Sequence, residues 1–254
     1  MVILVSNDDG FFARGLQPLV HRLSALGEVW VVAPETEQSA KSHGFTMHEP
    51  LRVKRHRERW FSVSGTPADC VYVALHHLLP ERPALVVSGI NRGSNLGNDV
   101  LYSGTVAAAM EGCLAGLPSI AVSLFINFEA LPETHNWDTA AKLSLDLARD
   151  LLANGTEPRT LLNLNVPDLP LDELMGVVPC QLGERLYDVL VDVRKDPRGR
   201  SYLWIGGKHH AFADIERSDG PLTERGYATV TPLQADLTNY RALAGLSAWN
   251  SFEP

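Results

Sequence analysis

The chain opens with Val2-Ile3-Leu4-Val5-Ser6-Asn7-Asp8-Asp9-Gly10, and this stretch decides the fold. Val2 to Val5 form a continuous apolar run of strand length, which is typical of a strand buried on both faces of a parallel sheet. Apolar residues then recur at helical spacing from residue 16 to residue 26, and Gly27 is placed to end that helix. The run Val29-Trp30-Val31-Val32-Ala33 predicts a second strand. The chain therefore begins with a β-α-β unit whose acidic residues directly follow the first strand.

The same alternation continues to about residue 170. Thr66-Pro67-Ala68-Asp69 favours the start of a helix, with a capping threonine, a proline at the first position and an acid near the positive end of the dipole. The pattern predicts further strands at 61–63, 85–87, 120–122 and 161–166, and further helices at 104–116 and 137–152. This repetition predicts an α/β fold with a doubly wound, Rossmann-like and mostly parallel sheet.

The rhythm changes after Pro170. Residues 187–194 and 201–205 flank Lys195–Gly199, which predicts a β-hairpin, and residues 226–231 predict one more strand before a tail at 239–254. We expect residues 1–254 to form a single α/β domain. Within it, residues 1–175 are the Rossmann-like core and residues 176–254 are an elaboration with a hairpin and a C-terminal arm.

Composition limits the possible functions. Of 254 residues, 22 are Lys or Arg and 30 are Asp or Glu, and the net charge of −8 argues against binding of long nucleic acids. The cysteines Cys70, Cys113 and Cys180 form no CxxC pair, so they are expected to be small buried apolar residues. The sequence shows no signal peptide and no apolar stretch of membrane-spanning length. It predicts a cytoplasmic protein with no membrane partner.

The polar residues after the strands define a candidate site, because ligands of doubly wound sheets bind beyond the carboxyl ends of the strands. Asp8 and Asp9 follow the first strand. Adjacent carboxylates repel and raise each other's pKa unless a cation lies between them. Both can reach one ion only if the chain leaves strand geometry, which Gly10 permits. The alternative is a solvated Asp-Gly turn.

Ser39 and Asn91 follow the second and third strands and would add neutral oxygens at the same edge. Two carboxylates with a hydroxyl, an amide oxygen and water form an all-oxygen site suited to Mg²⁺ or Mn²⁺. Taken singly, Ser39 is also typical of a loop or helix cap, and Asn91 of a turn.

The segment from Gly89 to Gly104 contains four glycines and leads into Ser103-Gly104-Thr105. A helix that opens there offers backbone amides to a phosphate, although such glycines also occur in ordinary turns. The segment matches neither a dinucleotide fingerprint nor a P-loop. Two weaker candidates are His209-His210, more typical of a loop, and the basic run Arg52–Arg59, which fits an exposed edge strand or phosphate steering.

Five motifs follow one another along the chain: Ser6–Gly10, Glu37–Ser39, Gly65–Cys70, Ser88–Asn91 and Tyr102–Thr105. Together they resemble the SurE family of stationary-phase survival nucleotidases, and the resemblance spans residues 1–238. Two later segments, Leu162–Pro167 and Val230–Thr238, match the family in the same order. The stretch Phe11–Arg14 is bulkier and more basic than the family pattern, and residues 218–225 also depart from it.

The resemblance implies a metal-dependent phosphomonoesterase that hydrolyses nucleoside 5′- and 3′-monophosphates, with short polyphosphate as a further substrate. It implies one divalent ion per subunit, Mg²⁺ or Mn²⁺, and a homodimer or homotetramer built with the hairpin and the C-terminal arm. The implied metal ligands are Asp8, Asp9, Ser39 and Asn91, and the implied phosphate contacts are Asn95, Ser103, Gly104 and Thr105.

Our hypothesis is metal-assisted hydrolysis, with Asp8 or Asp9 as the acceptor of the water's proton. Two alternatives remain at this point. A phosphatase that forms an aspartyl-phosphate usually has two aspartates one residue apart, so the adjacent pair disfavours it. A non-catalytic nucleotide-binding or sensor module would use the glycine-rich loop alone.

Overall fold

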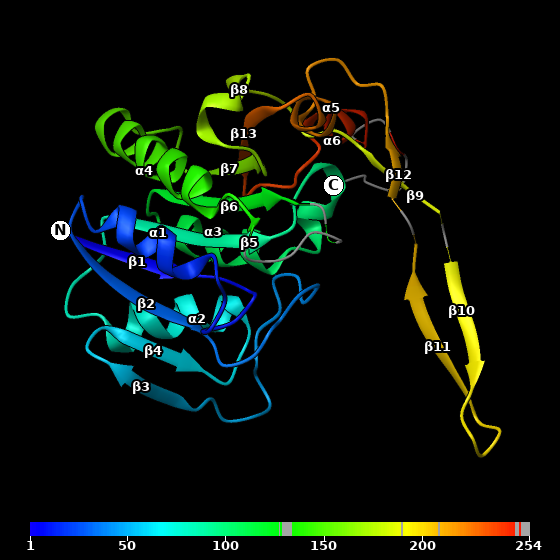
Figure 1. Cartoon of the computed structure of the whole chain (residues 1–254), viewed down its shortest axis with the longest axis horizontal. Coiled ribbons are helices and arrows are strands. Elements are labelled where there is room, and N and C mark those ends of the chain that lie inside the picture. Colours follow the sequence, from blue (N-terminus) through cyan, green and yellow to red (C-terminus); the bar gives the residue numbers. More distant parts are fainter. Residues whose placement is uncertain (127, 129–133, 189, 208, 247–248, 250–254) are drawn as a thin grey trace.

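The computed structural model describes residues 1–126, 128, 134–188, 190–207, 209–246 and 249. A nine-stranded sheet in the order β3-β4-β2-β1-β5-β6-β7-β13-β8 forms its centre (Figure 1). All neighbouring pairs are parallel except β3–β4 and β7–β13. The predicted doubly wound, mostly parallel sheet is therefore confirmed. The strands are β1 Val2–Ser6, β2 Glu28–Pro34, β3 Val53–Arg57, β4 Trp60–Val63, β5 Leu85–Arg92, β6 Ser119–Phe125, β7 Thr160–Pro167, β8 Gly176–Pro179 and β13 Tyr227–Gln234.

Helices cover both faces of this sheet (Figure 1). The helices α1 (Leu16–Leu23) and α4 (Trp137–Asn154) pack together on one face, and α2 (Pro67–Val73) and α3 (Gly104–Leu114) on the other. Ile3, Leu4 and Val5 are fully buried between these layers, as the apolar run predicts. The shorter helical segments are η1 Ala74–Leu78, η2 Gly97–Leu101, η4 Leu171–Glu173, α5 Asp219–Glu224 and α6 Tyr240–Leu246. No helix of the described chain combines the length and apolar character that crossing a membrane requires.

Local signals place most helix ends, with one difference. Thr66 caps α2 as predicted: its hydroxyl accepts from the Asp69 amide at 3.1 Å, and the Asp69 carboxylate accepts from the Thr66 amide at 2.8 Å. Helix α1, in contrast, ends at Leu23, well before Gly27. A Cβ on Gly27 would lie 2.3 Å from the carbonyl oxygen of Met1. This glycine therefore allows a close approach to the start of β1 rather than ending the helix.

The strand order reverses at β1, which lies between β2 and β5. Such a switch point leaves a crevice beyond the carboxyl ends of the strands, where ligands of this fold class bind. The basic run at 52–59 lies far from this point in the sheet order, on the edge strand β3, where most of its side chains are exposed.

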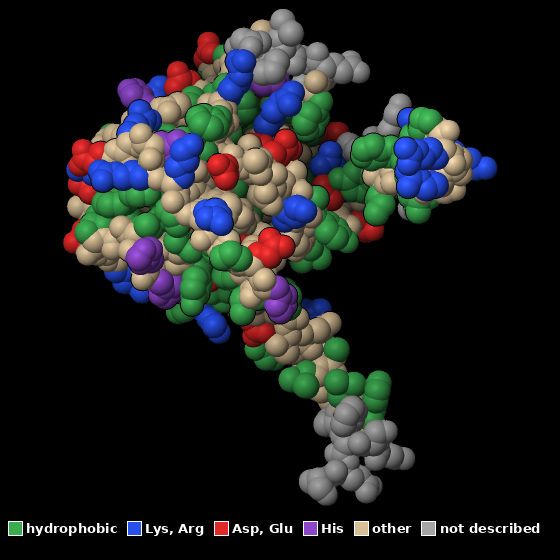
Figure 2. Space-filling model, turned by 90° about the horizontal axis from the view of Figure 1, so that it is seen from below, with side chains coloured by type: hydrophobic (Ala, Val, Ile, Leu, Met, Phe, Trp, Pro, Cys, Tyr) green, Lys and Arg blue, Asp and Glu red, His purple; other side chains and the backbone are tan. Residues whose placement is uncertain are grey.

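The C-terminal part both completes the sheet and extends from it. β8 and β13 join the central sheet, whereas β10 (Leu190–Lys195) and β11 (Ser201–Gly206) form an antiparallel ribbon that stands away from the body (Figures 1 and 2). At its base, β9 (Arg185–Tyr187) pairs with β12 (His209–Phe212). The predicted hairpin is present, but its first strand divides between β9 and β10. Of the predicted tail, residues 247–248 and 250–254 lie outside the described residues.

The cysteines behave as small apolar residues. Cys70 and Cys113 are buried, Cys180 is partly buried, and all three are free thiols. Burial raises the pKa of each thiol, which makes them poor nucleophiles.

Candidate functional site

Five of the eight predicted site residues line one cavity of about 370 Å³ at the switch point: Asp8, Ser39, Asn91, Asn95 and Ser103. Asp9 lines an adjoining cavity that shares the Ser39 wall. The remaining two residues, Gly104 and Thr105, begin helix α3 directly behind Asp8. The fold thus brings all eight residues to one place.

The turn after β1 holds the two aspartates outside strand geometry. The side-chain amide of Asn7 donates to the Gly10 carbonyl at 2.9 Å, and its oxygen accepts from the Gly10 amide at 3.2 Å. Gly10 has φ +96°, a conformation that favours glycine. The Gln38 amide donates to the Asp8 carbonyl at 2.7 Å, which ties the loop that carries Ser39 to this turn. The chain therefore bends where the sequence predicts.

Asp8 is fixed by the start of α3. Asp8 is 4% exposed, and its carboxylate accepts a hydrogen bond from the hydroxyl of Thr105, which is itself fully buried. A Cβ on Gly104 would lie 2.8 Å from the Asp8 Cβ, so only glycine lets the helix approach this closely. Ser103 caps the helix by accepting from the Val106 amide at 3.0 Å. The first-turn amides of α3, which have no partner within the helix, therefore begin beside Asp8.

Asp9 is held from the other side, because one of its oxygens accepts from the Arg92 amide at 2.8 Å. Burial, followed by the charge of Asp8, raises the pKa of Asp9 to about 7. Burial also raises the pKa of Asp8, and the Thr105 hydrogen bond offsets part of that rise. Neither carboxylate forms an ion pair with any side chain in the described ranges. Asp8 is buried and Asp9 is partly buried, and the charge of Arg92 offsets only a minor part of the rise in the pKa of Asp9. Two adjacent acids with no ion-pair partner are the arrangement that a divalent cation stabilises.

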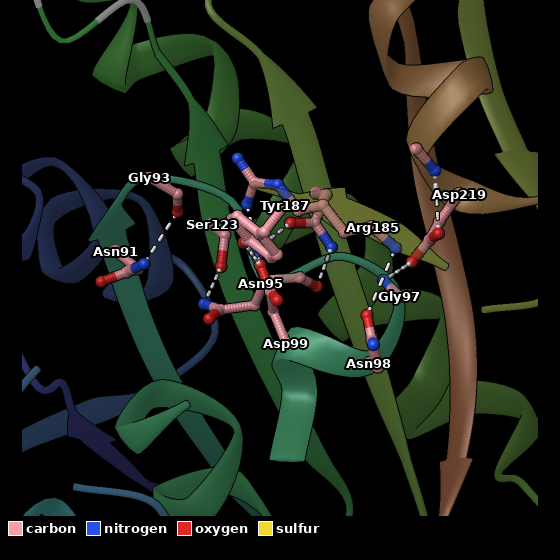
Figure 3. Close-up of polar contacts among 12 residues, drawn as sticks. Asn91, Gly93, Asn95, Gly97, Asn98, Asp99, Ser123, Arg185, Tyr187 and Asp219 are labelled. Atoms are coloured by element: carbon pink, nitrogen blue, oxygen red, sulfur yellow. Dashed lines mark hydrogen bonds and ion pairs between the residues drawn. The ribbon is translucent and has the colours of Figure 1, made fainter. Parts of the chain in front are cut away.

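The two neutral residues, Asn91 and Ser39, each keep an oxygen lone pair for such a cation. The Asn91 side-chain nitrogen donates to the Gly93 carbonyl at 2.8 Å, which leaves the amide oxygen at the other end (Figure 3). Ser39 is exposed, and its hydroxyl donates to the Glu37 carboxylate at 2.9 Å. Among the described residues no three His, Cys, Asp or Glu side chains gather as a metal cluster. The donor set that fits a metal is therefore two carboxylates with hydroxyl, amide and water oxygens, typical of Mg²⁺ or Mn²⁺.

Asn95 is clamped by residues that sequence reasoning missed. Its backbone amide donates to the Asn165 oxygen at 2.8 Å, and its carbonyl accepts from the side chains of Asn163 at 2.8 Å and Asn165 at 3.0 Å. Its side-chain nitrogen donates to the Ser123 hydroxyl at 2.7 Å (Figure 3). Two asparagines at period two in an apolar strand share one face, and that pattern was the available signal.

A second group ties the base of the ribbon to this cavity. Asp99 of η2 pairs with the Arg185 guanidinium at 2.9 Å and accepts from the hydroxyl of Tyr187, which lines the cavity (Figure 3). Burial and the hydrogen bond to Asp99 raise the pKa of Tyr187. No local sequence signal indicates this contact, because its partners lie 86 and 88 residues apart.

Asp219 was also not predicted from the sequence. It joins three segments of the chain next to Asp99 and the base of the ribbon. Its carboxylate accepts from the amides of Gly97, Gly183 and Gly220, each at 2.8 Å. It is fully buried, and burial raises its pKa while the amide donors oppose the rise. His209 and His210, the weaker candidates, lie on β12, and their side chains are outside the described residues.

Comparisons with known proteins show the family to which this chain belongs. A family model described as "Survival protein SurE" matches residues 3–189. Proteins named 5′-nucleotidase SurE are similar over nearly the whole chain. The protein of Geotalea uraniireducens is 48% identical, and the match covers 98% of this chain and 99% of that protein. The protein of Myxococcus xanthus is 50% identical, and the match covers 97% of this chain and 92% of that protein. The crystal structure of the SurE protein from Aquifex aeolicus superposes with a TM-score of 0.85 at 38% identity, covering 97% of this chain and 98% of its own. On both sequence and structure, this chain belongs to the SurE family.

Proposed function

We propose that this protein is a phosphoric monoester hydrolase, a divalent-metal-dependent nucleotidase that converts nucleoside 5′- and 3′-monophosphates to nucleoside and phosphate and also cleaves short polyphosphate. The observation that carries the proposal is the adjacent pair of Asp8, which is buried, and Asp9, which is partly buried, with no ion-pair partner in the described ranges and beside the first turn of α3. The name 5′-nucleotidase given to the similar proteins supports the same reaction.

In this proposal Asp8, Asp9, Ser39 and Asn91 hold one Mg²⁺ or Mn²⁺ ion per subunit. When bound, such an ion polarises a phosphoryl oxygen and lowers the pKa of bound water. The oxygen-only donor set fits this ion, whereas the described residues offer no cysteine or histidine at the site.

The chain's own groups bind the phosphate and move the proton. The side chains of Asn95 and Ser103 line the cavity, and Gly104 and Thr105 are the first residues of α3. In this proposal the two side chains and the backbone amides of Gly104 and Thr105 bind the phosphoryl oxygens. Asp8 or Asp9 accepts the proton that the attacking water loses.

The decisive experiment measures phosphate release from AMP with Mn²⁺ or Mg²⁺ by the wild type and by Asp8→Asn. We expect the substitution to lower kcat at least a hundredfold, because it removes one of two charges on the metal, while the melting temperature changes little. Near-normal metal-dependent hydrolysis by Asp8→Asn would overturn the site assignment. Tight AMP binding without release would favour a sensor module, and a trapped aspartyl-phosphate on Asp8 would favour the covalent mechanism.

The proposal extends to partners and location. The substrate is a small phosphate ester, and the protein acts on it in the cytoplasm. The net charge of −8 disfavours long nucleic acids as substrates. The apolar side chains of the β10–β11 ribbon support a homodimer or homotetramer in which this ribbon packs against another copy of the chain.

A further inference from the structure

A second cavity of about 410 Å³ adjoins the proposed phosphate site. It shares Ser39 and Arg92 with the first cavity, and Asp9 forms part of its wall. Its volume lies within the range of about 300–1,000 Å³ that is usual for small-molecule sites. A ligand that spans both cavities would pass directly beside the two aspartates.

The walls of the two cavities differ in chemistry. The first is lined mainly by carboxylate, amide and hydroxyl groups, and its aromatic rings are those of Tyr102 and Tyr187, which carry hydroxyls. The second contains the carboxylates Asp9 and Glu37, the cations Arg14 and Arg92, and three aromatic rings without a hydroxyl, those of Phe12, Phe128 and Trp137. Planar apolar faces beside cationic groups favour a flat heteroaromatic ligand rather than a second phosphate alone.

Phe12 is the most informative of these residues. Its neighbour Phe11 is 8% exposed and stacks on the His56 ring at 4.0 Å, so Phe11 belongs to the core. Phe12 is 80% exposed, although its ring touches Phe11 edge-on at 5.0 Å. The Phe11 amide donates to the Pro34 carbonyl at 2.8 Å and the Ala13 amide to the Gly10 carbonyl at 3.0 Å, so the turn that presents Phe12 is fixed. Phe12 and Phe128 are 80% and 64% exposed and line the same cavity, and exposed apolar side chains gathered in this way mark a ligand-binding groove.

Arg92 links the two cavities. Its backbone amide holds Asp9, and its guanidinium lies 5.5 Å from the centre of the Phe128 ring. The same residue therefore contacts a proposed metal ligand through its backbone and the aromatic cavity through its side chain.

We propose that this second cavity binds the nucleobase of the substrate, with the Phe12 ring as its stacking platform, so that nucleotides are preferred over sugar phosphates that lack a base. The proposal rests on the proposed nucleotidase function and adds the element that determines its substrate class. Purines, with the larger ring system, gain most from such stacking.

The test compares kcat/KM for AMP with kcat/KM for ribose 5-phosphate, which has the same sugar and phosphate without the base. We expect the wild type to prefer AMP at least tenfold and Phe12→Ala to lose most of this ratio, in line with the known contribution of base–aromatic stacking, roughly tenfold per base. Phe12→Tyr keeps the ring and should keep the ratio. Tyr72→Ala removes another exposed aromatic ring, one that lines neither cavity, and should leave both values as in the wild type.

The outcomes separate the two proposals. If the wild type releases phosphate from neither compound, the nucleotidase function is wrong. If the wild type cleaves AMP and ribose 5-phosphate equally well, the function stands and the base site is wrong. The same conclusion follows if Phe12→Ala lowers kcat/KM for the two compounds by the same factor, or lowers neither. Circular dichroism spectra matching the wild type show that each variant is folded.

Discussion

Asp8 and Asp9 are neighbours in the chain but are held by different parts of the fold. Asp8 is fixed by Thr105 at the start of α3, and Asp9 by the backbone of Arg92 at the end of β5. Adjacency in the sequence predicts mutual repulsion, and the Asp8 charge does raise the pKa of Asp9, but burial is the larger cause. Burial could not be predicted from the motif, because it depends on α3 and β5 closing over the turn.

A glycine at position 104 is required by this packing. We expect Gly104→Ala to lower kcat at least tenfold, because the new methyl group must displace the Asp8 side chain, 2.8 Å away, from its place in the site. Gly112→Ala in the same helix is the matched control, since its Cβ would lie 2.7 Å from the Ser119 hydroxyl, on the sheet side. Both should lower the free energy of unfolding by about 1–3 kcal/mol. Equal activity per folded molecule in the two variants would contradict the prediction.

The raised pKa of Asp9 predicts a pH dependence for metal-free protein. The unfolded chain loses this proton near pH 3.8 and the folded protein near pH 7, so in chelator the free energy of unfolding should fall as pH rises between these values. The difference corresponds to at most about 4 kcal/mol. Urea denaturation at pH 5 and pH 8 measures it. Asp9→Asn should flatten the slope, and Mn²⁺ should restore stability at pH 8; an identical slope in Asp9→Asn would refute the assignment.

At the scale of elements, β1, α2 and α3 were predictable from local signals. The hydrophobic run of the strand, the Thr66 cap and the helix start at Ser103 each depend on only a few neighbouring residues. The contacts that hold the loop after β5 were not predictable in this way. Asn163 and Asn165 are separated from Asn95 by 68 and 70 residues, so their pairing appears only once β7 is placed two strands away from β5.

The two asparagines of β7 should differ in importance. Asn165 both accepts from and donates to the Asn95 backbone, whereas the Asn163 side chain donates one bond to it. We expect Asn165→Ala to lower the free energy of unfolding by about 1–3 kcal/mol, because it leaves a buried amide unpartnered, and to lower kcat/KM for AMP more than Asn163→Ala does. Chemical denaturation and steady-state kinetics on both variants test this. A larger effect of Asn163→Ala on both quantities would show that the Asn165 pair does not position the loop.

At the scale of the whole molecule, the alternation of strands and helices was sufficient to predict the doubly wound sheet. It did not predict that β13 would pair antiparallel with β7 and carry β8 on its outer side, because such an edge depends on a chain reversal rather than on a periodic pattern. The hairpin was predicted from its Pro/Gly turn, but its detachment from the body is a tertiary feature (Figure 1).

The β10–β11 ribbon has an exposed apolar face. Val191 and Val193 pair with Ile205 and Leu203, so these four side chains share one face, and each is more than half exposed. An isolated two-stranded ribbon is marginally stable in water, and this apolar face gains most from a second copy of the chain. We expect the double substitution Val193→Lys with Leu203→Lys to reduce the mass in sedimentation experiments to that of a single chain. Asp192→Lys, on the opposite face, should leave the wild-type mass. A single-chain mass for the wild type, or an unchanged oligomer in the double variant, would show that the ribbon does not join the copies.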